Sequence, residues 1–171
     1  MSEPSQALAR IIIAIGSNLP DAEGHSPVMI CRAAVEALRG LPGCRLVAVS
    51  RWYRSPAWPP SDQPDYVNGA VLLAGTLAPI ALLRALQAIE AQGGRKRSVA
   101  NAARTLDLDI VDYDGQVRTT PELILPHPRA HERDFVLRPV ADLVPGWRHP
   151  VSGATAAALL DGLPATAARP L

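Results

Sequence analysis

Cysteine is scarce in this chain: of its 171 residues, only Cys31 and Cys44 are cysteines. Their spacing matches no metal-binding motif and both lie among apolar residues, so we expect two reduced structural thiols rather than a disulfide framework. Neither has a histidine close in sequence that could act as its base. Cysteine-based covalent catalysis is therefore not expected.

Long apolar runs and an excess of charge are also missing. The run from Ile11 to Ile15 is too short to cross a bilayer, and residues 1–10 lack the basic start of a signal peptide. Lysine and arginine total 17 and aspartate and glutamate total 16, which argues against a nucleic-acid partner that depends on bulk positive charge. The length suits one domain spanning residues 1–171. We therefore expect a monomeric, cytoplasmic protein with neither a membrane nor a nucleic-acid partner.

The common nucleotide-binding and hydrolase motifs are absent as well. The chain contains no G-x-x-x-x-G-K-[ST], G-x-G-x-x-G or G-x-S-x-G sequence, which excludes the usual P-loop, dinucleotide-binding turn and nucleophile elbow. His127 and His131 are four residues apart, but Pro128 interrupts any helix that would turn both toward one zinc ion. If the protein binds ATP, arginine side chains have to hold the phosphates.

What the chain does have is a cationic stretch that runs into a pair of carboxylates. Arg95, Lys96 and Arg97 precede the run Arg104-Thr105-Leu106-Asp107-Leu108-Asp109-Ile110. Alternate side chains of a β-strand share a face, so a strand here would pair Asp107 with Asp109. Close carboxylates repel unless a divalent cation lies between them, and Mg²⁺ binds a few carboxylates together with phosphate oxygens. The pattern favours a polyphosphate and metal site, although an isolated D-x-D is more often a solvated strand edge.

Hydrophobic periodicity and the glycine and proline positions predict alternating strands and helices. Strands are expected at 10–15, 44–56, 66–76 and 106–112, and helices at 27–40 and 79–93. This β-α-β-β-α-β order predicts an α+β, ferredoxin-like fold with a four-stranded antiparallel sheet and both helices on one face. A C-terminal extension is expected to add a hairpin turn at Asp114-Gly115, a short helix at 135–143 and a helix at 152–160 capped by Ser152.

Aromatic residues make up only 4% of the chain, and Tyr66 and Phe135 lie at the edges of proline-rich loops. Two such rings can sandwich a flat heterocycle, and Asn68, on the strand face of Tyr66, offers an amide to the polar edge of a ring. The alternative is that both rings fill the core, as isolated aromatic residues more often do.

Together these segments resemble the 6-hydroxymethyl-7,8-dihydropterin pyrophosphokinases of folate biosynthesis, from Ile12 to about Pro145. The matching segments are Ile15-Gly16-Ser17-Asn18, Asp62-Gln63-Pro64-Asp65-Tyr66-Val67-Asn68, Gly94-Arg95-Lys96-Arg97, Arg104-Thr105-Leu106-Asp107-Leu108-Asp109, and Pro126-His127-Pro128-Arg129 with His131-Glu132-Arg133 and Phe135. The resemblance implies an enzyme that transfers the β,γ-pyrophosphoryl group of ATP to the hydroxymethyl oxygen of the pterin and releases AMP.

The resemblance also implies roles for the matched residues. Asp107 and Asp109 would bind two Mg²⁺ ions, and Arg95 and Arg104 would be the catalytic arginines. The pterin would be enclosed by Tyr66 and Phe135, with Asn68 on its polar edge. The ATP contacts would come from Gln87, Glu90, Arg97, His127 and Arg133. Pro59 stands where the family usually has a glycine, and we expect the neighbouring Trp58 to form a wall of the pterin pocket.

The segment between Arg95 and Arg104 is rich in small residues, which predicts a loop that closes as a lid once ATP is bound, in an ordered reaction. Two other classes remain open from the residues alone. One is a ferredoxin-like module that binds single-stranded RNA by stacking, against which the near-neutral charge counts. The other is a different metal-dependent phosphotransferase or a nuclease that uses the same carboxylate pair.

Overall fold

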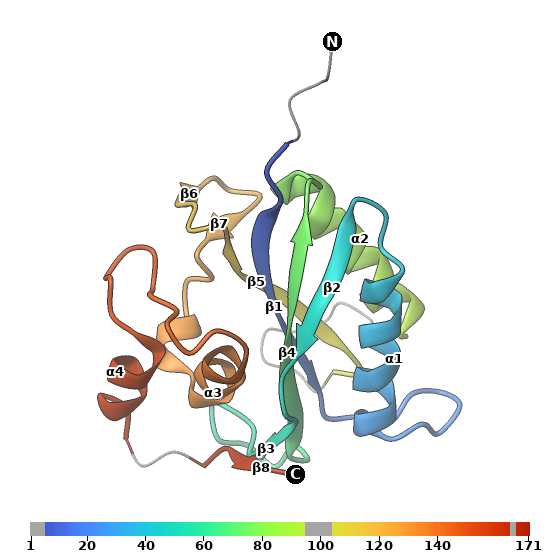
Figure 1. The fold of residues 1–171 in the computed structure, drawn as a ribbon. Coiled ribbons are helices and arrows are strands. Elements are labelled where there is room, and N and C mark those ends of the chain that lie inside the picture. Colours follow the sequence, from blue (N-terminus) through green and yellow to red (C-terminus); the bar gives the residue numbers. More distant parts are fainter. Residues whose placement is uncertain (1–5, 95–103, 165–166) are drawn as a thin grey trace.

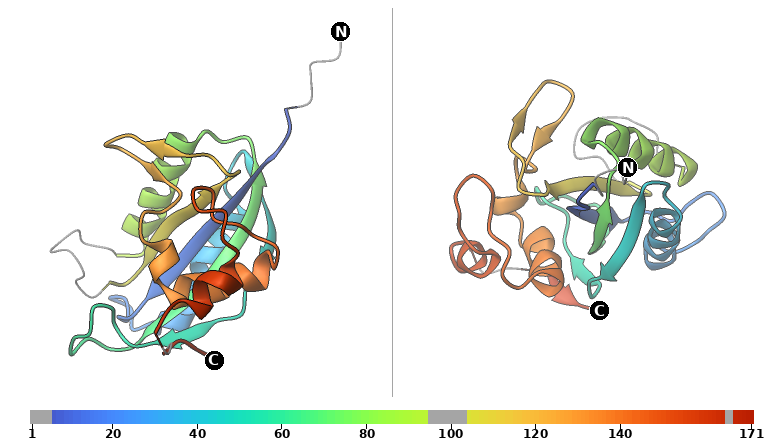
Figure 2. Two further views of the ribbon diagram at one scale, coloured as in Figure 1. Left: turned by 90° about the vertical axis from the view of Figure 1, so that its left-hand side faces the viewer. Right: turned by 45° about the horizontal axis from the view of Figure 1, so that its top comes forward.

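The computed structural model describes residues 6–94, 104–164 and 167–171. It is an α+β structure in which an antiparallel sheet has helices on both of its faces (Figures 1 and 2). The sheet follows the order β5 (Asp107–Tyr113), β1 (Ala9–Ser17), β4 (Tyr66–Gly75), β3 (Tyr53–Ser55) and β8 (Arg169–Pro170), and β2 (Cys44–Val49) also pairs with β4. None of the described helices has the length and apolarity needed to cross a membrane.

The first strand, β1, is central because it is apolar on both faces. Ile11, Ile13 and Ile15 belong to the core on the side of α1 (Pro27–Arg39) and α2 (Pro79–Gln92). Ile12 belongs instead to the core on the side of α3 (Asp134–Leu143). A strand buried on both faces has a continuous apolar sequence, so the buried strand predicted at 10–15 is confirmed.

The helices α1 and α2 lie where the sequence predicts them. Each has a proline in its first turn, where the missing N–H group is not needed, and each is followed by a glycine. Ser26 caps α1 by accepting a hydrogen bond from the backbone N–H of Met29. Leu38 of α1 and Leu86 of α2 belong to one core cluster, and Figure 1 shows both helices on the same side of the sheet.

The single strand predicted at 44–56 is wrong, because the chain forms two strands there. Ser50 interrupts the ladder: its N–H group donates to the carbonyl of Ala70, and its hydroxyl accepts from the N–H of Ala70, both at 2.9 Å. The register against β4 changes between β2 and β3. A side chain that replaces a backbone partner competes with the strand ladder, and β3 thereby becomes a separate short strand.

The C-terminal extension is helical, but part of its prediction is wrong. The predicted helix at 135–143 is confirmed as α3. The next helix, α4 (Ala156–Asp161), begins later than expected, because Thr155 accepts from the N–H of Ala158 at 3.1 Å and is its cap. Ser152 instead accepts from the N–H of Ala154 in the preceding turn.

The turn at Asp114-Gly115 exists, with positive φ at both residues, but it does not form the predicted hairpin. The strand that follows it, β6 (Arg118–Thr119), pairs with β7 (Ile124–Leu125) in a separate two-stranded sheet. A short 3₁₀ helix, η1 (Ala130–Glu132), then leads into α3. The segment after β5 therefore turns away from the main sheet and reaches the opposite face.

Candidate functional site

A pocket opens where β1, β4, β5 and the start of α3 meet. It is lined by Ala14, Ile15, Gly16, Ser55, Pro56, Trp58, Tyr66, Asn68, Gly69, Arg104, Asp107, Asp109, Arg133, Phe135 and Val136. Eight of the predicted site residues belong to this lining, and they come from segments far apart in the sequence. The pocket is therefore built by the tertiary fold.

The strand register places the predicted pterin-binding residue Asn68 and the predicted metal ligand Asp107 on either side of one residue of β1. Gly16 of β1 lies opposite Asn68 on β4 and opposite Asp107 on β5. A Cβ atom at Gly16 would lie 3.3 Å from Oδ1 of Asn68 and 3.8 Å from the ring of Tyr66, so a larger residue would crowd the pocket floor. The sequence had marked Gly16 only as part of a family motif, because its closeness to Asn68 arises from strand pairing.

The carboxylates of β5 point into the pocket as the strand alternation predicts. Asp107 and Asp109 line it, whereas Leu108 and Ile110 are buried in the core on the other face. The Nη1 atom of Arg104 lies 2.7 Å from Oδ2 of Asp107, a short charge-assisted hydrogen bond. Two carboxylates and a guanidinium group thus share one wall.

The charge of Asp109 is strongly influenced by its surroundings. Its burial, the nearby Asp107 and the carboxylate of Glu90 together raise the pKa of Asp109 to about 7. The Nε2 atom of His127 lies 3.7 Å from Oδ2 of Asp109. Burial and the positive charge of Arg133 lower the pKa of His127 to about 4, so this imidazole is neutral near pH 7. Protein atoms surround the Asp109 carboxylate, but 37% of its side chain is exposed on the pocket side, so a ligand can reach it.

The predicted ATP-binding residues of α2 do not line the pocket. Glu90 is only 4% exposed, and its Oε1 atom accepts a 2.8 Å hydrogen bond from the backbone N–H of Leu108. Gln87 lies one turn earlier on α2 and is half-buried. Glu90 therefore holds the backbone of β5 through a hydrogen bond from α2. The sequence does not reveal this contact, because it joins two elements that are distant in the chain.

The predicted aromatic walls do meet at the pocket. Tyr66, Phe135 and Trp58 all belong to its lining, and the Trp58 side chain is 51% exposed. Asn68 is 5% exposed, and its Nδ2 atom donates a 2.8 Å hydrogen bond to the hydroxyl of Ser55. This bond uses one of the two N–H groups of the amide and orients the Asn68 side chain. Ser55 is a lining residue that the sequence interpretation had missed.

Arg133 is the least satisfied cation of the pocket wall. Its guanidinium carbon lies 5.7 Å from the centre of the Phe135 ring, and its Nε atom is buried without a hydrogen-bond partner in the described part of the chain. Burial lowers the pKa of Arg133 from its ordinary value. An unpaired buried N–H donor is rare in proteins, and an anionic ligand would satisfy it. Arg95 and Arg97, predicted to act beside it, lie outside the described residues.

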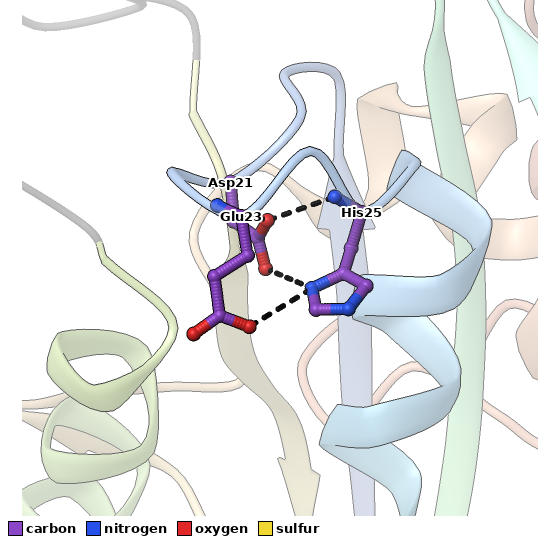
Figure 3. A group of neighbouring side chains, drawn as sticks. All are labelled: Asp21, Glu23 and His25. Carbon is purple, nitrogen blue, oxygen red and sulfur yellow. Dashed lines mark hydrogen bonds and ion pairs between the residues drawn. The ribbon is translucent and has the colours of Figure 1, made fainter.

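Asp21, Glu23 and His25 form a separate cluster in the loop before α1 (Figure 3). Oδ1 of Asp21 accepts the backbone N–H groups of Glu23 and His25, and its Oδ2 lies 2.8 Å from Nδ1 of His25. The hydrogen bond between the two side chains lowers the pKa of Asp21 and raises the pKa of His25. The cluster is thus a local ion pair that closes the loop.

The sequence is similar to a known family over most of its length. Residues 12–145 match the family described as 7,8-dihydro-6-hydroxymethylpterin-pyrophosphokinase (HPPK). A 2-amino-4-hydroxy-6-hydroxymethyldihydropteridine pyrophosphokinase from Pseudomonas aeruginosa is 46% identical over 143 residues, which cover 84% of this chain and 85% of the relative. The relative of the same name from Synechocystis is 37% identical over 161 residues, covering 94% and 79%.

Solved structures of Plasmodium falciparum HPPK-DHPS resemble this chain in fold. A triple mutant with STZ-DHP superposes with a TM-score of 0.69 at 11% identity, covering 92% of this chain and 44% of that chain. A triple mutant with pteroate gives a TM-score of 0.66 at 12% identity. The chain thus spans less than half the length of these solved chains, and identity this low shows a shared fold alone.

Proposed function

The chain belongs to the 7,8-dihydro-6-hydroxymethylpterin-pyrophosphokinase family, and we propose that the pocket between β1, β4, β5 and α3 is its active site. The enzyme is a pyrophosphokinase of folate biosynthesis, which transfers pyrophosphate from ATP to 6-hydroxymethyl-7,8-dihydropterin. One observation carries the assignment of the site: aromatic, amide, carboxylate and guanidinium side chains from four distant segments line a single pocket.

The pterin occupies the end of the pocket formed by β4 and α3 in this proposal. Tyr66 and Phe135 contact the two faces of the ring, and Trp58 forms the outer wall. Asn68 supplies the polar contact to the amide edge of the pterin. One of its two N–H groups donates to Ser55, which leaves the carbonyl oxygen to accept from the ligand and the second N–H group to donate to it.

Asp107 and Asp109 are the groups that would hold Mg²⁺, and we propose two ions. Their chemistry fits, because oxygen donors on one strand face suit a hard divalent cation. The raised pKa of Asp109 means that the metal-free pair tends to keep a proton, which a divalent cation would displace. When bound, Mg²⁺ neutralises phosphate charge and orients the phosphates.

The arginines stabilise the charge of the transferred group. Arg104 donates from Nη1 to Asp107. A guanidinium group has five N–H donors, so others can contact phosphate oxygens. Arg133 offers its unpaired Nε donor, while neutral His127 adds a polar contact beside Asp109. We propose that Arg95 and Arg97 complete the cationic set and that Gln87 contributes to the ATP side from α2, whereas the buried Glu90 acts through its hydrogen bond to Leu108. Such transfers depend mainly on positioning and electrostatic stabilisation.

In the reaction, the hydroxymethyl oxygen of the pterin forms a bond to the β-phosphorus of ATP and releases its proton to solvent. The bond between the β-phosphorus and the oxygen bridging it to the α-phosphorus breaks, and AMP leaves.

The enzyme acts as a monomer without a nucleic-acid or membrane partner, and its compartment is the cytoplasm. The strand order β5-β1-β4-β2, with α1 and α2 on one face, supports a ferredoxin-like core to which β3 and β8 are additions.

The test is AMP formation from ATP and Mg²⁺, measured with and without 6-hydroxymethyl-7,8-dihydropterin. We expect pterin-dependent AMP from the natural enzyme, and a loss of at least about 100-fold in Asp107→Asn and Asp109→Asn, because the electrostatic terms they carry dominate such catalysis. Asp161→Asn, an exposed change on α4, is the matched control and should keep full activity.

Four outcomes would contradict the proposal. ADP as the product would indicate ordinary phosphoryl transfer, and nuclease activity in the same preparation would favour the other metal-dependent class. Pterin-independent AMP formation would separate ATP cleavage from the pterin pocket. Unchanged turnover in both aspartate variants would mean that the carboxylate pair is not the metal site.

A further inference from the structure

We propose that the C-terminal strand β8 and the residue before it position the pterin-binding wall of the pocket. This inference rests on the proposed function, because it concerns how tightly the pterin is held. The family match ends at residue 145, so this segment lies beyond the matched part of the chain. It joins β3 on one side of the pocket to the start of α3 on the other.

On the first side, β8 stabilises β3 from its outer edge. Tyr53 lies opposite Pro170 and Arg54 opposite Arg169, and the N–H of Leu171 donates to the carbonyl of Trp52 at 3.0 Å. Proline has no N–H group to donate to a strand ladder. It is tolerated in an edge strand, where one side of the backbone has no partner strand. The last residue of β3 is Ser55, whose hydroxyl accepts from the Asn68 amide. The strand β8 thus supports the partner of Asn68.

On the second side, the chain just before β8 is tied to the first residue of α3. Ala168 is 5% exposed, and its N–H donates a 2.9 Å hydrogen bond to Oδ2 of Asp134. Asp134 lies between Arg133 and Phe135, which both line the pocket. A bond to the carboxylate of Asp134 therefore restrains the backbone that carries the Phe135 ring.

This restraint matters because a groove, rather than packed core, lies behind the wall. The groove shares Ser55, Pro56, Trp58 and Phe135 with the pocket. Its far side includes Leu163, Pro164 and Ala167 of the C-terminal segment. Close packing holds side chains in place only where atoms fill the space around them. The Phe135 ring packs against the core on one side, and the hydrogen bonds of residues 168–171 add a restraint on the side of the groove.

The bond can be removed from either partner in the full-length chain. Asp134→Ala removes the acceptor, Ala168→Pro removes the donor, and Asp134→Asn keeps an acceptor oxygen. Asp161→Ala, which removes an exposed carboxylate from α4, is the matched control. Steady-state kinetics would be measured for each substrate at saturation of the other, together with the melting temperature and pterin binding by its fluorescence.

We expect Asp134→Ala and Ala168→Pro each to raise the KM for the pterin about tenfold, the loss typical of a hydrogen bond to a charged group. The KM for ATP should rise less than the KM for the pterin, because Arg133 adjoins Asp134 whereas Arg104 and the metal-binding carboxylates lie at β5. Asp134→Asn should recover most of the pterin affinity, and the control should match the natural enzyme. A purely structural role would instead lower the melting temperature and affect both substrates alike.

The positioning role is overturned if both variants leave the pterin KM within about twofold of the natural value, or raise both KM values equally. A failure of Asp134→Asn to recover affinity while Ala168→Pro has no effect would also overturn it. A natural enzyme that forms no pterin-dependent AMP is a failure of the proposed function, and it is seen before any variant is made.

Discussion

The carboxylate of Glu90 on α2 accepts a 2.8 Å hydrogen bond from the backbone N–H of Leu108, the residue between Asp107 and Asp109. Glu90 is 4% exposed, so its carboxylate is shielded from solvent. The helix α2 thereby fixes the backbone of β5 between Asp107 and Asp109.

Replacing Glu90 with alanine should destabilise the protein by about 1–3 kcal/mol, because the buried N–H of Leu108 loses its acceptor. Glu90→Gln should cost less, since an amide oxygen can still accept. Urea unfolding measures both changes, and the Mg²⁺ dependence of the rate reports the effect on β5. Equal stability of the alanine and glutamine variants would show that the hydrogen bond contributes nothing.

Asp109→Asn should remove activity and yet stabilise the metal-free protein above neutral pH. The pKa of Asp109 is raised from 3.8 to about 7, so the folded state holds a proton that the unfolded chain has released. The favourable contribution is fully present below pH 3.8 and is lost as the pH rises through about 7. Unfolding in EDTA should therefore show a larger gain for the variant at pH 8 than at pH 5. A gain that is independent of pH would contradict the assigned pKa.

The ring of His25 should titrate above its ordinary pKa of 6.5, because the hydrogen bond to Asp21 favours the protonated form. The ion pair is fully present below pH 6.5 and is lost as the pH rises through the raised value. It also weakens in acid once Asp21, whose own pKa is lowered, gains a proton. In an NMR titration Asp21→Asn should lower the His25 pKa clearly. Glu23→Gln is the control and should lower it less, since that carboxylate lies 3.6 Å away.

Trp147→Phe should destabilise the protein by about 2 kcal/mol, because a hydrogen bond to a buried carboxylate is lost. The Nε1 atom of Trp147 donates to Oδ2 of Asp112 at 2.9 Å, and Asp112 is 1% exposed. Trp58→Phe is the matched control, since Trp58 is 51% exposed, and its unfolding free energy should hardly change. Equal unfolding midpoints for the two variants in urea would rule out this role for the Trp147 bond.

The sequence determined the local features of this protein. The alternation of Asp107, Leu108 and Asp109 placed both carboxylates on one face, because side-chain direction in a strand depends only on neighbouring residues. The isoleucine run identified the central strand, and proline and glycine marked the ends of α1 and α2. The family motifs identified seven of the predicted site residues that line the pocket, and Trp58 was expected beside the departure at Pro59.

Tertiary structure alone decided what supports those residues. The interruption at Ser50, the position of Glu90 beneath β5 and the bond between Ala168 and Asp134 all join segments far apart in the chain. No local pattern encodes such contacts, because each depends on the register and packing of elements that meet only after folding. The type of chemistry could be predicted from the sequence for this reason, whereas the restraints on the pocket walls had to be found in the structure.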